Sequence, residues 1–291
     1  MMGNSIVPQK VDTMPHTRRW YSSVRNRLKS SSARRIGWAL TNRKALISNQ
    51  QEEDFYRKLL VGLQRDDIIF DIGANEGAKA DIFLRLGARV VAVEPDNTCQ
   101  AILRDRFLSY RFRSCPVTIV NKAVSDKIGT ADMWVDGPGS AVNTISRKWA
   151  DYLTNHREEF KYEHQGLEFS QSKAIETTTI TDLIKLYGMP FFVKIDVEGN
   201  ELNVLRGMRQ PVPFLSFEVN LELFREDGVE CVERLSKLTP DGRFNYASDC
   251  CAGFALPEWL KPEKFIEVLK TCADETVEVF WKSNCDAVRS Q

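Results

Sequence analysis

Residues 192–200 read Phe192-Val-Lys-Ile-Asp-Val-Glu-Gly-Asn200. In this stretch an apolar strand carries Lys194 and ends in two carboxylates, Asp196 and Glu198, before a glycine turn. Charged side chains at the end of a buried strand cost free energy unless they have partners, so they often mark a site. A structural ion pair would give the same pattern. A second strand and turn upstream support the interpretation that these charges belong to a functional site.

The upstream stretch, residues 68–77, reads Ile68-Ile-Phe-Asp-Ile-Gly-Ala-Asn-Glu-Gly77. Its turn has Asp71, Gly73, Asn75 and Gly77 in alternation, in place of the three glycines that a dinucleotide requires for close approach of the pyrophosphate. A carboxylate at Asp71 would repel a pyrophosphate but suits a cationic amino-acid group. We therefore expect these four residues to form a loop for a cofactor without phosphates.

Glu94 ends the next predicted strand and is placed to accept two hydrogen bonds from a ribose diol. An adenosyl group that carries a positive amino acid and no phosphate is S-adenosylmethionine (SAM). The alternative is that Asp71 and Glu94 only cap the helices that follow them.

Predicted strands alternate with helical patterns along most of the chain. Several of the strands are continuous apolar runs, which is typical of a parallel sheet that is covered on both faces. Alternation of strand and helix predicts an α/β fold, a doubly wound and mostly parallel sheet, and the last two strands are expected to pair antiparallel at its edge. The predicted strands are 68–71, 89–94, 117–124, 191–195, 214–219, 244–247 and 276–281.

The composition, with 43% hydrophobic and 27% charged residues among 291, is that of a globular chain. No apolar run approaches the roughly 20 residues that span a bilayer, and the sequence shows no secretory signal. The seven cysteines are scattered, without Cys-x-x-Cys spacing. This pattern predicts reduced, mostly buried thiols and a cytoplasmic protein.

Charge divides the chain into two parts. Residues 1–50 hold ten Lys or Arg and one acid, Asp12, so the rest is acidic overall. Within this basic arm, Trp20, Val24 and Leu28 recur at helical spacing among arginines, after a start that is expected to be disordered. Three roles remain open: contact with an anionic membrane face or nucleic acid, a targeting segment, or packing against the body or a second subunit.

Five segments together resemble the FkbM family of SAM-dependent O-methyltransferases. They are Asp71-Ile-Gly-Ala-Asn-Glu-Gly77, Val93-Glu94-Pro95, Asn121-Lys-Ala-Val-Ser-Asp126, Lys194-Ile-Asp-Val-Glu-Gly-Asn-Glu201 and Asn203-Val-Leu-Arg-Gly-Met208. The resemblance covers about residues 65–220. It implies a Rossmann-like class I methyltransferase domain, here residues 51–291, with SAM as cofactor and a hydroxyl of a small molecule or glycan as acceptor. It also implies cofactor roles for Asn121 and Asp126. Glu76 departs from the family pattern, in which an apolar residue is more common.

Transfer to an alcohol requires alignment of the reactants and removal of a proton. Asp196 is the candidate base. Lys194, two residues earlier on the same face of the strand, either holds Asp196 ionised or binds an acceptor oxygen. Glu198 and Glu201 are expected to support the site. Asp196 and Glu198 would be the ligands if Mg²⁺ took part, which is the less favoured alternative.

The turn-rich loop at residues 137–144 supplies two further candidates for acceptor contacts, Ser140 and Asn143. A polar insertion at about residues 148–173 contains His156 and His164, which are interpreted as surface residues, and is a candidate lid. The Asp196-Val-Glu-Gly segment does not resemble the Asn/Asp-Pro-Pro-aromatic segment of nucleic-acid amine methyltransferases, so no nucleic-acid partner is expected. Two other classes remain as alternatives: a non-catalytic SAM-binding scaffold and, more remotely, a nicotinamide-dependent oxidoreductase.

Overall fold

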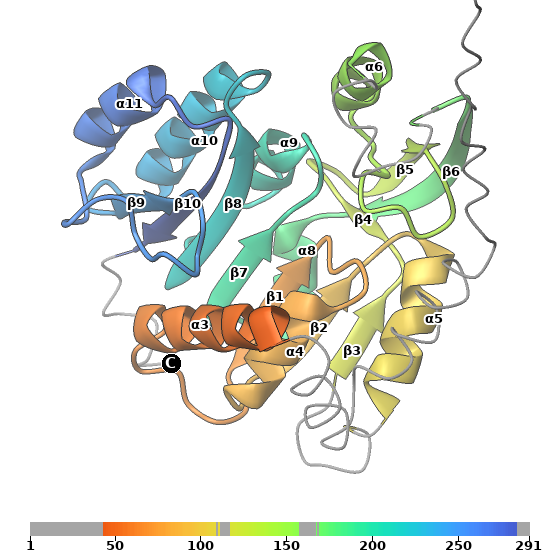
Figure 1. Ribbon diagram of the computed structural model, residues 1–291, viewed down its shortest axis with the longest axis horizontal. Coiled ribbons are helices and arrows are strands. Elements are labelled where there is room, and N and C mark those ends of the chain that lie inside the picture. Colours follow the sequence, from red (N-terminus) through yellow and green to blue (C-terminus); the bar gives the residue numbers. More distant parts are fainter. Residues whose placement is uncertain (1–42, 109, 111–116, 157–166, 168, 284–291) are drawn as a thin grey trace, which may run out of the picture.

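The computed structural model describes residues 43–108, 110, 117–156, 167 and 169–283. Its centre is a seven-stranded sheet in the order β3-β2-β1-β7-β8-β10-β9 (Figure 1). The strand β10 is antiparallel to both of its neighbours, β8 and β9, and the other neighbouring pairs are parallel. The strands are β1 (Ile68–Ile72), β2 (Arg89–Val93), β3 (Val117–Val120), β7 (Phe192–Ile195), β8 (Phe214–Asn220), β9 (Arg243–Ala247) and β10 (Thr276–Lys282).

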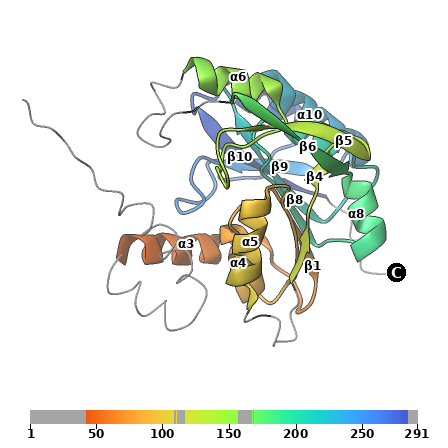
Figure 2. The same cartoon turned by 90° about the vertical axis from the view of Figure 1, so that its right-hand side faces the viewer.

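Helices cover both faces of this sheet, as Figure 2 shows from the side. One apolar cluster joins α3 (Arg43–Leu59), α4 (Ala78–Arg85) and α5 (Asn97–Arg106) to one face. A second cluster joins α8 (Ile180–Tyr187), α9 (Glu201–Arg206), α10 (Arg225–Leu238) and α11 (Pro262–Thr271) to the other. The prediction of a doubly wound, mostly parallel Rossmann-like sheet with antiparallel pairing at its edge is confirmed.

One predicted strand divides in two. The run expected at residues 117–124 gives β3 in the main sheet and β4 (Ala123–Val124) in a separate three-stranded sheet of order β4-β6-β5. The strand β6 (Gln171–Thr178) is parallel to β4 and antiparallel to β5 (Gly129–Val135). The strand β6 was not predicted because most of its side chains are exposed.

The insertion and the arm are each described in part. The helix α6 (Arg147–Asn155) occupies the start of the insertion, with Ser146 as its N-cap, and His164 lies outside the described residues. The helix α3 runs across the domain boundary expected near residue 50, and the helical pattern at residues 18–29 lies outside the described residues. None of the described helices is long and apolar enough to cross a membrane.

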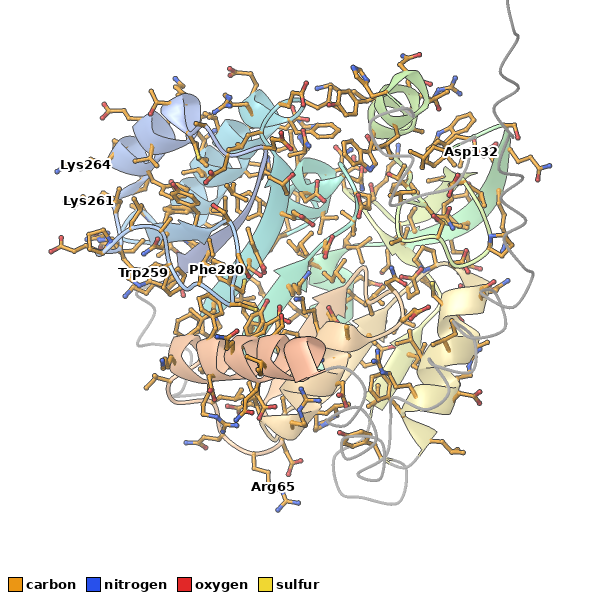
Figure 3. The ribbon with its side chains drawn as sticks, in the orientation of Figure 1. Arg65, Asp132, Trp259, Lys261, Lys264 and Phe280 are labelled. Atoms are coloured by element: carbon orange, nitrogen blue, oxygen red, sulfur yellow. The ribbon has the colours of Figure 1, made fainter. Side chains whose placement is uncertain are left out.

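Phe254 and Trp259, in the connection between β9 and α11, pack on the α3 side of the sheet. The ring of Phe254 contacts those of Trp259 and Phe280, both labelled in Figure 3, at centroid distances of 5.1 and 5.3 Å, and that of Phe55 in α3 at 4.9 Å. This aromatic cluster connects α3 to the body. Five described cysteines carry free thiols; Cys99 and Cys231 are buried, and the other three are half-buried.

Candidate active site

A cavity with an empty volume of about 860 Å³, including its mouth, lies at the carboxyl ends of β1, β2, β7 and β8. This is where ligands bind in open α/β sheets. Seven of the residues expected at the site line it: Gly73, Asn75, Glu94, Ser140, Asn143, Asp196 and Glu198. Apolar side chains, among them Val93, Met133 and Ile145, form other parts of its wall.

Two glycines shape the turn after β1. Gly73 has φ +81°, and a Cβ added there would lie 1.7 Å from the carbonyl oxygen of Asp196. Gly77 has φ +80° at the start of α4, and a Cβ there would meet Leu103 and Phe107 at less than 3 Å. Only glycine fits such positions without displacement of its neighbours. The turn after β1 therefore packs directly against the turn after β7.

Glu94 organises the loops around the cavity. One of its carboxylate oxygens accepts the backbone N–H of Asn75 and the other accepts that of Asp96, both at 2.8 Å. Burial raises the pKa of Glu94 to about 7, although these two hydrogen bonds oppose the shift. Each carboxylate oxygen has acceptor capacity for more than one donor, so Glu94 can still receive the hydroxyls of a ribose.

Asp71 is buried in β1 and is not part of the cavity lining. It is 1% exposed, faces Lys194 in the register of β1 and β7, and its Oδ2 has no hydrogen-bond partner in the structure. Burial raises the pKa of Asp71 to about 6, against the influence of Lys194. The structure thus places Asp71 beside the buried lysine.

Lys194 and Asp196 form an ion pair at the end of β7. The Nζ of Lys194 donates to Oδ2 of Asp196 at 2.7 Å, and the two side chains are 4% and 30% exposed. Burial opposes both charges, but the Asp196 carboxylate raises the pKa of Lys194 and Lys194 lowers the pKa of Asp196. Asp196 is therefore a carboxylate at neutral pH, at the edge of the cavity.

Glu218, on β8, lines the same cavity and was missed in the sequence analysis. Its side chain forms a hydrogen bond with that of Asp196. Burial and the charge of Asp196 raise the pKa of Glu218 to about 10, so it carries the proton of this hydrogen bond. The signal that marked Asp196, an acid near the end of an apolar strand, is also present in Phe214-Leu-Ser-Phe-Glu218.

Glu198 and Glu201 lie in and after the turn that follows Asp196. Glu198 lines the cavity in a left-handed conformation (φ +56°), and burial together with Asp196 raises its pKa to about 8. Glu201 accepts the backbone N–H groups of Val197 and Gly199 at 3.1 and 3.2 Å. Glu201 thus holds the turn that presents Asp196 and Glu198.

The loop that contains Ser140 and Asn143 closes another side of the cavity. Asn143 donates to Oδ2 of Asp96 at 3.1 Å and accepts the backbone N–H of Asp136 at 3.0 Å, while Ser140 donates to Asp136. His156 stacks on Tyr152, with ring centroids 4.2 Å apart, and does not line the cavity.

Asn121 and Asp126, expected near the cofactor from the resemblance, are exposed and do not line the cavity. Lys122 lines it instead and pairs with Glu176 at 3.0 Å. In the part of the chain that the structure describes, no three His, Cys, Asp or Glu side chains are arranged to hold a metal ion.

The residues present fit SAM. The glycine turn allows backbone to approach a ligand, Glu94 retains capacity for ribose hydroxyls, and the apolar wall suits an adenine ring. The fold and this cavity together define a SAM-dependent class I methyltransferase.

Comparison with known proteins agrees with this class. Residues 71–239 match the model of the methyltransferase FkbM domain. The chain is 26% identical over 207 residues to the hexuronic acid methyltransferase AglP of Haloferax volcanii, covering 69% of this chain and 76% of that protein. The chain therefore belongs to the FkbM methyltransferase family. A nicotinamide-dependent oxidoreductase, one of the alternatives left by the sequence, is a different class of enzyme.

Solved methyltransferase structures are also similar to this chain, at lower sequence identity. The precorrin-6Y C5,15-methyltransferase of Geobacter metallireducens has a TM-score of 0.38 at 12% identity, covering 80% of this chain and 84% of that one. The plantazolicin methyltransferase BpumL, in complex with SAH, has a TM-score of 0.37 at 10% identity, covering 91% and 97% of the two chains.

Proposed function

We propose that this methyltransferase transfers the methyl group of SAM to a hydroxyl oxygen of a sugar or a related polyol. The observation that carries the proposal is the group of carboxyl side chains on one part of the cavity wall, Asp196, Glu198 and Glu218. The hydroxyl group of a methyl acceptor can donate a hydrogen bond to such a side chain. The name of the relative AglP, a hexuronic acid methyltransferase, supports a sugar as the acceptor.

The same carboxyl groups argue for a hydroxyl over a carboxylate as the reacting group. An acceptor carboxylate would approach the ionised Asp196 and be repelled. Lys194 offsets this repulsion only in part, because it is buried and does not line the cavity, whereas Asp196 does. A neutral hydroxyl can donate to Asp196 and present its oxygen to the methyl group.

Bound SAM supplies a methyl group activated by a sulfonium. The chain's own residues would do the rest: Glu94 and the turn from Gly73 to Gly77 would hold the nucleoside and amino-acid parts, and Asp196 would orient the acceptor. Alignment of this kind contributes about 7–11 kcal/mol to rate enhancement. Small-molecule or glycan acceptors that reach the cavity from its mouth fit this arrangement.

The proposal is tested with SAM labelled in its methyl group and two acceptors, a neutral hexose glycoside and a hexuronic acid glycoside, alongside total cell glycans. We expect label in a product that survives mild alkali, because methyl ethers resist conditions that hydrolyse methyl esters. Label released as methanol would show a carboxylate acceptor and contradict the proposal. SAM binding without transfer to any of these acceptors would favour the non-catalytic scaffold.

A further inference from the structure

Glu218 lines the cavity next to Asp196. The strands β7 and β8 are parallel neighbours with Ile195 opposite Phe217, so Asp196 and Glu218 follow at adjacent positions where the strands reach the cavity. Both side chains line the cavity, and they are joined by a hydrogen bond. No ion pair of Glu218 is present among the described residues.

Acidic groups of several neighbouring elements lie near Glu218. Asp196 and Glu198 lie on the cavity side, and Glu278 lies directly opposite on β10. A small second cavity, of about 210 Å³, is lined by Glu218 together with Glu201 of α9 and Asp227 of α10.

Two lysines act on this group. Lys194 is bound to Asp196, and Lys79 of α4, which is paired with Glu52, also lowers the pKa of Asp196. Because Lys194 favours the charge on Asp196, a proton shared by the two carboxyl groups resides on Glu218. The burial of Glu218 and the charge of Asp196 act in the same direction and raise its pKa to about 10. Asp196, in contrast, already accepts hydrogen bonds from Lys194 and Glu218, which makes it a weak base.

We propose that Glu218 is the residue that takes the proton of the acceptor hydroxyl, while Asp196 orients that hydroxyl. The proposal rests on the proposed function. In the resting protein Glu218 is protonated; the positive charge of a sulfonium in the same cavity favours its ionised form, so Glu218 gives its proton to solvent when SAM binds.

As the O–CH₃ bond forms and the CH₃–S bond breaks, the hydroxyl proton moves to the Glu218 carboxylate and the sulfonium becomes a neutral sulfide. Glu218 is then protonated, as in the resting protein. One proton is released per turnover, and it leaves at the SAM-binding step.

The test measures proton release on SAM binding and needs no acceptor. Titration calorimetry of the full chain at pH 9, in two buffers that differ in ionisation enthalpy, gives the number of protons released per ligand bound. At this pH Glu198, with a pKa of about 8, is mostly ionised, whereas Glu218, with a pKa of about 10, is mostly protonated. The proteins compared are the wild type, Glu218→Gln and Glu278→Gln.

Gln at position 218 keeps the size of the side chain and its ability to donate to Asp196, but has no proton to release. Glu278 is the matched control: it accepts hydrogen bonds from Tyr56 and Ser216, and is not part of the cavity lining. S-adenosylhomocysteine, the product left when SAM loses its methyl group, has a neutral sulfide and therefore controls for the charge of the sulfonium.

We expect the wild type and Glu278→Gln to release about 0.5–1 more proton per SAM than Glu218→Gln does, with no such difference for S-adenosylhomocysteine. Equal release by wild type and Glu218→Gln would overturn the role of Glu218 and leave the proposed function intact. Absence of SAM binding to the wild type would contradict both. Loss of SAM binding in Glu218→Gln alone would make Glu218 a binding residue and overturn its role as proton acceptor.

Discussion

The ammonium group of Lys194 lies 2.7 Å from the carboxylate of Asp196, two residues further along the chain. This ion pair joins a buried lysine to a carboxylate at the edge of the cavity. Lys194 is almost fully buried, and Asp71 lies beside it in the register of β1. This lysine therefore links the ends of the two strands that carry the most distinctive sequence segments.

We expect Lys194→Met to lower the free energy of unfolding by on the order of 3 kcal/mol, because it leaves buried carboxylates without their cation. Urea denaturation at pH 7.5 measures the change. The matched control is Arg206→Gln, which removes a pair with Glu230 in which both side chains are 42% exposed. It should cost less than about 1 kcal/mol. Equal effects would show that the buried pair has no special stabilising role.

Asp196→Asn keeps the size of the side chain but removes the charge that orients the acceptor hydroxyl. Turnover should fall by about 10²-fold, the cost of a misplaced acceptor, whereas SAM affinity should change less than about tenfold. Methyl transfer and calorimetry give the two quantities. Treatment of the wild type with EDTA tests the magnesium alternative, for which activity would be lost and then restored by Mg²⁺. Turnover of Asp196→Asn near the wild-type rate would place the acceptor elsewhere.

Glu94 and Asp126 were both expected near the cofactor, but only Glu94 lines the cavity. Glu94→Ala should weaken SAM binding tenfold or more, because hydrogen bonds to a charged group contribute about 1.5–3 kcal/mol each. Asp126→Ala, on the exposed surface, should leave the affinity unchanged. Calorimetry with SAM separates the two, and a similar loss in both variants would contradict the placement of the nucleoside beside Glu94.

The close contact between the turns after β1 and β7 makes Gly73 sensitive to substitution. In Gly73→Ala, the Cβ would overlap the carbonyl oxygen of Asp196, so we expect loss of SAM binding and a large fall in the melting temperature. Gly253→Ala is the control, because Gly253 has a similar φ of +95° with no atom within 4 Å of an added Cβ. It should cost only the conformational penalty of about 1–2 kcal/mol. A melting temperature for Gly73→Ala close to that of the control would argue against the contact.

The free energy of unfolding of the SAM-free protein should fall as pH rises from about 6 to about 9. Five acids have pKa values in the folded protein above their ordinary 3.8 or 4.5: Asp71 (about 6), Glu94 and Glu201 (about 7), Glu198 (about 8) and Glu218 (about 10). Between the two values the folded state binds more protons than the unfolded state. Each group therefore lowers stability by up to about 1.4 kcal/mol per pH unit in its window.

The Lys194–Asp196 pair does not oppose this trend. The lowered pKa of Asp196 gives stability that is already complete above its ordinary value of 3.8, and the raised pKa of Lys194 gives stability that is lost only at higher pH. Urea denaturation at pH 6, 7.5 and 9 measures the trend, and Glu218→Gln should flatten its upper part. Stability that rises over this range would show that the acids are not desolvated in the folded protein.

Much of the fold was determined by local features of the sequence. Apolar runs at strand length and helical periodicity gave the doubly wound sheet, because a strand covered on both faces must be apolar throughout. The division of residues 117–124 between two sheets and the strand β6 were not predictable in this way. The division is decided by which strands become hydrogen-bonded neighbours, and β6 lacks an apolar run because its side chains are mostly exposed.

The sequence by itself determined which strand ends carry the acids and glycines of the site. A buried charge costs free energy unless it has a partner, and glycine is favoured where the backbone turns sharply, so both mark these strand ends. It also placed Asp196 beside Lys194 through the two-residue period of a strand. Only the tertiary structure decided that Glu218 joins them, that Asp71 is covered, and that Asn121 and Asp126 remain outside the cavity. Those relationships depend on which strands become neighbours and how deeply each side chain is buried, and neither is a property of a local stretch of chain.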